Sequence, residues 1–432
     1  MASRKFMGGV HPPDSKEATR GLVTTRAALP DSLIVPMSQH LGAPCAPLVS
    51  KGDRVRRGQI MGNVEAMVSA PVHSPVDGEV ASVGTTMVAS GQTVAAVVIT
   101  PDEEQDYETF VQIPEGEPCD MVRAAGIVGL GGAAFPTTVK LHPPNDSPVH
   151  TVILNGCECE PYLTCDHRLM LERPERIVAG ARLMRDMVGA DRVVIGVEDN
   201  KPDAVEALKS VAGSDVEVLS LPTHYPQGAE KQLIYAVLGA EVTHGKLPAS
   251  AGALVQNVGT AAAVADAVEL RRPLIERTMT VTGAVVRPRN MTVLLGTPIS
   301  HILAEAGGLS ADAGRVISGG PMTGMALADL ELPVVKGTSG IVALRQNESA
   351  PAVYGDQACI RCARCADACP MGLQPFTMGV HANRGDWDAC EALHMLDCIE
   401  CGCCSFICPT RRPLVQLFRR AKHALLSRGK RS

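Results

Sequence analysis

The stretches CIRCARCADACP (residues 359–370) and CIECGCCSFICP (residues 398–409) share one spacing of four cysteines followed by proline. In each stretch two residues separate the first three cysteines, and three residues separate the third from the fourth. Ten of the chain's 15 cysteines lie between Cys359 and Cys408. The start of the chain, MASRKFMGGVHPPDSK, lacks a continuous apolar segment, so we expect a cytoplasmic protein in which structural disulfides are rare. Clustered cysteines in that setting favour metal binding.

The spacing is typical of bacterial ferredoxins that hold two [4Fe-4S] clusters. Three closely spaced cysteines wrap around one cluster, and the fourth cysteine binds the other cluster. For cluster one the predicted ligands are Cys359, Cys362, Cys365 and Cys408. For cluster two they are Cys369, Cys398, Cys401 and Cys404. Zinc is the alternative, but it needs four ligands in two pairs rather than two runs of four.

Length and composition limit the class of protein and the kinds of partner that the chain can have. A length of 432 residues suggests two to four domains. With 45% hydrophobic and 20% charged residues the chain is an ordinary globular protein. Only 3% of residues are aromatic, so large stacking surfaces for bases are unexpected and no nucleic-acid partner is predicted. No apolar run of about 18 residues is present, which predicts no membrane-spanning helix.

Hydrophobic periodicity divides the chain into modules. Short strands with frequent turns predict a small β module over residues 1–105. Alternating helical and short apolar segments predict an α/β domain with a mostly parallel sheet over residues 115–272. A small α+β module is expected at residues 275–346. The cysteine runs place a ferredoxin-type module at 352–410, and a basic tail follows at 411–432.

A glycine-rich loop, GIVGLGGAAFPT, occupies residues 126–137. It formally matches the dinucleotide fingerprint, but residues 118–125 before it are helical in character, and Pro136 falls where the fingerprint helix would continue. Because glycine has no side chain, the loop can still let a phosphate or a planar ring approach the backbone. A tight surface turn is the alternative.

Polar residues follow the predicted strand that begins at Thr151. The segment NGCECEP, residues 155–161, places an amide and two carboxylates at the carboxyl end of that strand. In α/β sheets this end is where ligands bind. Three cysteines, Cys157, Cys159 and Cys165, lack a fourth ligand, so we expect reduced thiols there rather than a third metal site.

Together these motifs resemble the C-subunit family of the Rnf (Rsx) electron-transport complexes, over nearly the whole chain from His11 to Pro409. The central part is similar to the NADH-oxidising flavoprotein subunit of respiratory complex I. The resemblance implies a barrel-sandwich hybrid, a Rossmann-like FMN- and NADH-binding α/β domain, an SLBB β-grasp module and a two-cluster ferredoxin-like domain. The hybrid resembles biotin carriers, but Val68 replaces the modified lysine, so its role is expected to be structural.

The resemblance also implies a flavin site. Gly129, Gly131, Gly132 and Lys140 would hold FMN and its phosphate. The remaining implied residues lie along flavin and nucleotide, and they are Asn155, Glu158, Glu160, Gly228, Glu230, Asn257 and Thr260. Phe135 would line the nicotinamide site, with ordinary core packing as the alternative. No acid–base residue is predicted, since hydride transfer from NADH needs none.

The resemblance implies that electrons pass from NADH through FMN and two [4Fe-4S] clusters to partner subunits. Some of these partners would be integral-membrane proteins, and ferredoxin would be reached through them. The protein would then lie on the cytoplasmic face of a prokaryotic membrane, without spanning it.

Two other functions remain open at this point. One is a soluble flavin and iron–sulfur reductase, such as a cobalamin reductase. The other is a non-enzymatic ferredoxin-type carrier, because Ala229, Gln256 and Gly259 depart from the complex I motifs.

The tail has two possible roles. Apolar residues recur at helical spacing from Leu414 to Leu425, with basic residues on the other faces. This amphipathic helix either packs on its own ferredoxin module or docks to a membrane or an acidic partner.

Overall fold

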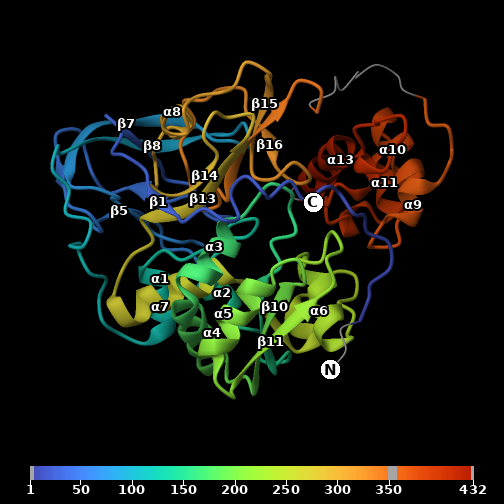
Figure 1. Cartoon of the computed structure of the whole chain (residues 1–432), viewed down its shortest axis with the longest axis horizontal. Coiled ribbons are helices and arrows are strands. Elements are labelled where there is room, and N and C mark those ends of the chain that lie inside the picture. The colour runs from blue at the N-terminus through green and yellow to red at the C-terminus, as the bar shows by residue number, and fades with distance from the viewer. Residues whose placement is uncertain (1–3, 349–357, 430–432) are drawn as a thin grey trace.

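The computed structural model describes residues 4–348 and 358–429. The parts of the predicted modules at residues 1–3, 352–357 and 430–432 lie outside the described residues. In Figure 1 the two β modules lie together on one side of the α/β domain, and the C-terminal helical module lies beside them. Four sheets form the β structure of the described residues.

The first module is a sandwich of two small antiparallel sheets. One sheet contains, in spatial order, β2 (Leu33–Pro36), β8 (Thr93–Pro101), β7 (Gly78–Met87) and β4 (Arg54–Val55). The other contains β3 (Ala46–Pro47), β5 (Ile60–Asn63) and β6 (Val72–His73). Alternate residues of β2 and β8, such as Leu33, Val97 and Ile99, are fully buried between them, as expected for strands with one face on a core.

The second module has the expected parallel sheet. Its strand order is β11 (Val216–Leu221), β10 (Arg192–Glu198), β9 (Thr151–Gly156) and β12 (Ala253–Asn257), and all neighbours are parallel. Helices cover both faces, so the central strands β9 and β10 are mostly apolar and buried, whereas the edge strand β11 carries Glu217 and Ser220. Val152 and Leu154 of β9 pack into one core cluster, whereas Ile153 packs into the cluster on the opposite face.

The helices of this domain are α1 (Pro118–Ala124), α2 (Thr137–Lys140), α3 (Cys165–Glu172), α4 (Pro174–Val188), α5 (Pro202–Ala212), α6 (Glu230–Leu238) and α7 (Val258–Leu270), with the 3₁₀ turn η1 (Pro248–Ala251). A helix, α1, precedes the glycine loop, as the sequence predicts, and α2 is only one turn long. The loop therefore does not open a dinucleotide-type helix.

The β-grasp module is a mixed six-stranded sheet. Its order is β1 (Thr25–Arg26), β14 (Arg289–Leu294), β13 (Glu276–Gly283), β17 (Gly340–Arg345), β15 (Ala313–Ser318) and β16 (Met325–Ala326). The helix α8 (Ile299–Glu305) packs on it through Ile299, Ile302 and Leu303.

The N-terminal segment of residues 4–26, called the N-terminal strap below, lies outside the sandwich. Its end, β1, pairs in parallel with β14 of the β-grasp sheet. Farther back, Val10 pairs with Tyr225 of the α/β domain, and the N–H of Gly9 donates to the carbonyl of Ala368 at 3.0 Å. The strap thus contacts three modules in turn.

The C-terminal module consists of short helices. They are α9 (Arg364–Asp367), α10 (Pro375–Arg384), α11 (Trp387–Ala392), the 3₁₀ turn η2 (Met395–Asp397), α12 (Cys403–Phe406) and α13 (Leu414–Gly429). Among the described residues, none of the helices combines the length and apolar character needed to cross a bilayer.

The predicted tail helix, α13, packs on its own ferredoxin-type module. Leu414, Phe418 and Ala421 are buried in that module's core. Glu400 forms ion pairs with Arg419 at 3.0 Å and with Lys422 at 2.7 Å. The apolar stripe and part of the basic charge are therefore used within the chain.

Candidate functional site

Asn155 links the end of β9 to the loop that precedes α6. Its amide nitrogen donates to the carbonyl oxygen of Gly228 at 2.8 Å, and its amide oxygen accepts from the N–H of Cys157 at 3.0 Å. A Cβ added at Gly228 would lie 3.3 Å from both polar atoms of the Asn155 side chain. The two predicted site residues therefore meet at the carboxyl edge of the sheet.

The glycine loop lies over the start of α7. The hydroxyl of Thr260 accepts from the N–H of Leu130 at 2.9 Å, and Arg277 of the β-grasp module donates to the Leu130 carbonyl at 2.6 Å. A Cβ at Gly131 would lie 2.7 Å from the amide nitrogen of Asn257, so no side chain fits there. These contacts bring the predicted residues Gly131, Asn257 and Thr260 together.

The tip of the loop offers donors to a ligand. Gly131 and Gly132 are exposed, and a Cβ at Gly132 would meet nothing within 4 Å. Within residues 4–348 and 358–429 no acceptor is found for the N–H groups of these two glycines. Free N–H groups on bare backbone suit a phosphate or the polar edge of a flavin ring, so the loop fits FMN.

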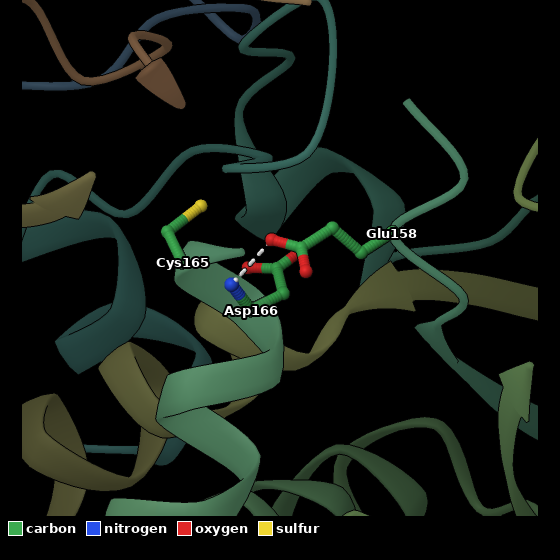
Figure 2. Close-up of side chains that lie close together, drawn as sticks. All are labelled: Glu158, Cys165 and Asp166. Carbon is green, nitrogen blue, oxygen red and sulfur yellow. Dashed lines mark hydrogen bonds between the residues drawn. The ribbon is translucent and has the colours of Figure 1, made fainter. Parts of the chain in front are cut away.

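Two carboxylates face each other beside this loop (Figure 2). The Glu158 carboxylate accepts from the N–H groups of Asp166 at 2.7 Å and His167 at 3.1 Å, which lie in the first turn of α3. Asp166 in turn accepts from the amide of Asn257 at 2.6 Å. Burial and the nearby charge of Glu158 raise the pKa of Asp166 to about 6. Sequence reasoning did not identify Asp166, because an acidic residue in the first turn of a helix is ordinary.

The thiols near this pair have backbone partners of their own. The sulfur of Cys165 donates to the carbonyl of Ser339 at 3.2 Å, and that of Cys157 lies 3.7 Å from the carbonyl of Gly196. Burial raises the pKa of both thiols well above the usual value. One ligand atom each of Glu158, Cys165 and Asp166 lie within 4.8 Å of one another. However, the hydrogen bonds described above already engage all three groups.

Glu160 lies apart from Glu158, where three modules meet. Its carboxylate accepts from the N–H of Met322, in the β-grasp module, at 3.1 Å. The hydroxyl of Tyr225 lies 3.4 Å from the same carboxylate and 2.6 Å from the carbonyl of Cys401. Burial raises the pKa of Glu160.

Lys140 pairs with Glu230 at the edge of the site. Its ammonium lies 2.6 Å from the Glu230 carboxylate and 3.2 Å from the carbonyl of Val255. Phe135 is half-buried, and its carbonyl accepts from the N–H of Gly129 at 2.9 Å, which closes the glycine loop.

A buried lysine of the N-terminal strap donates hydrogen bonds to residues 158–163, which we call the acidic segment. Lys16 is only 4% exposed, and its ammonium donates to the carbonyls of Glu158 at 2.8 Å, Glu160 at 3.0 Å and Leu163. It also lies 3.9 Å from the Glu158 carboxylate. No sequence signal pointed to Lys16, since it stands alone in a segment without a periodic pattern.

The cysteines of the two runs line two cavities. The cluster-one cavity is lined by Cys359, Cys362, Cys365 and Cys408. The cluster-two cavity is lined by Cys369, Cys398, Cys401 and Cys404, with Cys403 beside them. Each cavity combines three cysteines of one run with the fourth of the other, which is the grouping that crossed ligation predicts.

Other features of these cavities fit cubane clusters. Most of the remaining lining is apolar, including Phe376, Met378 and Phe418. Backbone N–H groups point at the sulfurs of predicted ligands, as Arg361 does at Cys359 and Glu400 at Cys398, each at 3.4 Å. All fifteen cysteines are free thiols. Ligation itself stays a prediction.

Family models match most of the chain. Residues 4–104 match the RnfC barrel sandwich hybrid domain, residues 122–266 the Nuo51 FMN-binding domain, and residues 278–326 the SLBB domain. The fold class expected from the sequence is thereby confirmed. A solved structure of an NAD+-reducing [NiFe]-hydrogenase in the H2-reduced state has a similar fold, with a TM-score of 0.50 and 21% identity over 71% of this chain and 62% of that one.

Curated relatives align over the full length. A protein of Acetobacterium woodii, named as the C subunit of a Na(+)-translocating ferredoxin:NAD(+) oxidoreductase complex, is 45% identical over 99% of this chain and 98% of its own length. The C subunit of the proton-translocating complex of Clostridium ljungdahlii is 41% identical over 99% of this chain and 95% of its own. The corresponding C subunit of Rhodobacter capsulatus is 40% identical over the whole of this chain and 85% of its own. The chain therefore belongs to the C-subunit family of ion-translocating (Rnf) oxidoreductase complexes and is an oxidoreductase component.

Proposed function

We propose that this chain collects electrons from NADH and passes them through two [4Fe-4S] clusters to other subunits of a membrane complex, or carries them in the reverse direction. The observation that carries the proposal is the path from the glycine loop to the cysteines. The acidic segment beside that loop contains Glu160, and Tyr225 joins Glu160 to Cys401. FMN, when bound, accepts a hydride from NADH and releases the electrons singly.

The roles of the individual residues follow from their chemistry. Backbone N–H groups at Gly131 and Gly132 would donate to the flavin or its phosphate, and Gly129, whose N–H is bonded to the Phe135 carbonyl, would keep the loop closed. Lys140 would supply positive charge at the same edge. Asn155, Gly228, Asn257 and Thr260 fix the loops in place. Glu158, Glu160 and Glu230 set the local charge, and Phe135 covers the nicotinamide side. In this proposal no side chain transfers a proton.

The relatives' names support the wider setting. Proteins aligned over the full chain are named as C subunits of ion-translocating complexes. We therefore assign other Rnf-type subunits as partners, including integral-membrane ones, with ferredoxin reached through them at the cytoplasmic face. The same names favour this setting over a soluble cobalamin-type reductase or a non-enzymatic carrier.

The experiment is reconstitution with iron, sulfide and FMN, followed by reduction with NADH under anaerobic conditions. The expected product contains one FMN and about eight irons per chain, four for each cluster, and NADH bleaches its flavin absorbance. Gly131→Val should abolish FMN binding and keep the iron, because a side chain at this position meets Asn257. Gly116→Val is the matched control, since a Cβ there meets nothing within 4 Å. Protein that neither retains FMN nor reacts with NADH would refute the proposal.

A further inference from the structure

The two cysteine cavities have different surroundings. The cluster-two cavity faces the rest of the chain. Tyr225 donates to the carbonyl of Cys401 at 2.6 Å, and Gln232 donates to the carbonyl of Pro370 at 3.2 Å. A Cβ at Gly8 of the strap would lie 2.6 Å from the carbonyl oxygen of Cys369, and one at Gly402 would lie equally close to the carbonyl of Met322. Three other parts of the chain therefore enclose this cavity.

The cluster-one cavity faces outward. Cys362 is exposed, and Ile360, which also lines the cavity, is 63% exposed. Among the described residues, no hydrogen bond or ion pair joins residues 359–365 or 408–412 to another module. An electron at cluster one is thus close to the surface, with an exposed ligand and an exposed apolar side chain beside it.

Unpaired arginines lie in the two segments that supply the cysteines of this cavity. We call Arg361, Arg364 and Arg411 the basic rim. All three are exposed, and none has a side-chain hydrogen bond or ion pair within the part of the chain that the structure describes. Asp367 is the one acidic residue within 359–367. By contrast, Arg419 of α13 is paired with Glu400.

Two residues of the basic rim lie in the left-handed backbone region. Arg361 has a φ of 56° and Arg411 a φ of 50°. The left-handed region disfavours residues with a Cβ by about 1 kcal/mol or more, and glycine or asparagine is common there. The chain nonetheless carries arginine at both positions, next to residues that line the cavity.

We propose that cluster one is the outer cluster and that the basic rim docks an acidic electron-transfer protein against Cys362 and Ile360. The inference rests on the proposed function, in which the electrons come from NADH. It adds the place on the surface where they pass to or from another protein. A second copy of this chain would bring the same positive rim and be repelled. Opposite charge steers a redox partner into contact, and the small apolar centre suits a transient complex.

The exchange is a one-electron step. A reduced cluster one loses one electron and becomes oxidised, while the partner's oxidised centre gains that electron. No covalent bond forms or breaks between the proteins. Two such transfers account for the hydride that one NADH supplies.

The test uses the reconstituted holoprotein and an acidic two-[4Fe-4S] ferredoxin as the probe. The holoprotein is reduced with dithionite, freed of reductant and mixed with oxidised probe in a stopped-flow instrument at low and high salt. The rim variant is Arg361→Glu with Arg411→Glu. The control, Arg384→Glu with Lys209→Glu, makes the same change in net charge at two exposed residues outside the rim.

The wild-type transfer rate should fall with salt, and the rim variant should be at least about tenfold slower at low salt, with little remaining salt dependence. The control should stay within about twofold of wild type. Iron content and the EPR signals of both clusters verify that each variant is assembled. An equal loss in the control, or a wild-type rate that ignores salt, would overturn the proposal.

Binding to vesicles containing anionic lipid separates a second possibility. If the rim variant loses vesicle binding but transfers electrons to the probe at the wild-type rate, the rim contacts a membrane and the proposal is wrong. Chemical reduction keeps this test independent of NADH. A failure of NADH to bleach the flavin would refute the proposed function and leave the docking result intact.

Discussion

The hydroxyl of Tyr225 lies 2.6 Å from the carbonyl oxygen of Cys401 and donates a hydrogen bond to it. Tyr225 is 4% exposed, and the strap residue Val10 exchanges backbone hydrogen bonds with it. One phenol group therefore connects the α/β domain to the loop of cluster-two cysteines, in a position that water does not reach. A buried polar group left without its partner is costly, which makes this contact a sensitive place to perturb the docking of the two modules.

Replacing Tyr225 with phenylalanine should loosen the ferredoxin-type module. The variant leaves the Cys401 carbonyl unpaired, at a cost of about 1–3 kcal/mol. We expect the loss of cluster absorbance during chemical denaturation to occur at lower denaturant concentration. Tyr235→Phe is the control, because Tyr235 lies on α6 and makes no side-chain hydrogen bond within the described residues. Equal midpoints for Tyr225→Phe and wild type would contradict the prediction.

Single cysteine replacements should reveal the crossed ligation. Cys362→Ala and Cys408→Ala lie in different runs but line the same cavity, so both should remove the same EPR signal. Cys369→Ala should remove the other signal. Each variant should keep about four irons. Cys390→Ala should keep both signals, since Cys390 lines neither cavity. If Cys362→Ala and Cys369→Ala lost the same signal, each run would bind its own cluster.

Local patterns explain how much of the fold was predictable. Within residues 174–188 the apolar residues recur at helical spacing up to Gly189, which predicts a helix, and α4 has these limits with Gly189 as its left-handed C-cap. Strand β12 (Ala253–Asn257) was not predicted, since five residues leading directly into a helix resemble the start of that helix. The cysteine spacing is equally local, and the two cavities combine the cysteines as the spacing predicts.

The rest of the site depends on contacts between residues far apart in sequence. Lys16 meets the segment from Glu158 to Leu163, and Arg277 meets Leu130, more than one hundred residues away in each case. Neither basic residue belongs to a motif, because a buried lysine or arginine is recognisable only by the carbonyls around it. The pairing of Lys140 with Glu230 is hidden for the same reason, although both residues were singled out from the sequence.

Lys16→Met should destabilise the α/β domain and weaken FMN retention. The methionine fills a similar volume but leaves three buried carbonyl oxygens and the Glu158 carboxylate without the ammonium. Breaking a buried charged contact typically costs about 3–5 kcal/mol. Thermal unfolding followed by circular dichroism and the FMN content after gel filtration measure the two effects. Lys51→Met, at an exposed turn, is the control. Unchanged FMN content in the Lys16 variant would show that the strap does not position the acidic segment.

Asp166→Asn should change how stability depends on pH. Burial and Glu158 raise the pKa of Asp166 to about 6, above its usual value of 3.8. The folded protein therefore holds this proton more tightly than the unfolded chain. Its contribution to stability is complete below pH 3.8 and is lost as the pH rises through about 6.

Asparagine carries no titrating proton and keeps an oxygen that can accept from Asn257. The variant should therefore gain stability relative to wild type as the pH rises from about 5 to about 7.5, by about 1 kcal/mol. Chemical denaturation across this range measures the difference. Asp191→Asn is the control, because the Asp191 side chain is 87% exposed and solvent surrounds it in both states. If the Asp166 and Asp191 variants followed the same pH profile, burial and the charge of Glu158 would not hold the Asp166 carboxyl in its protonated form.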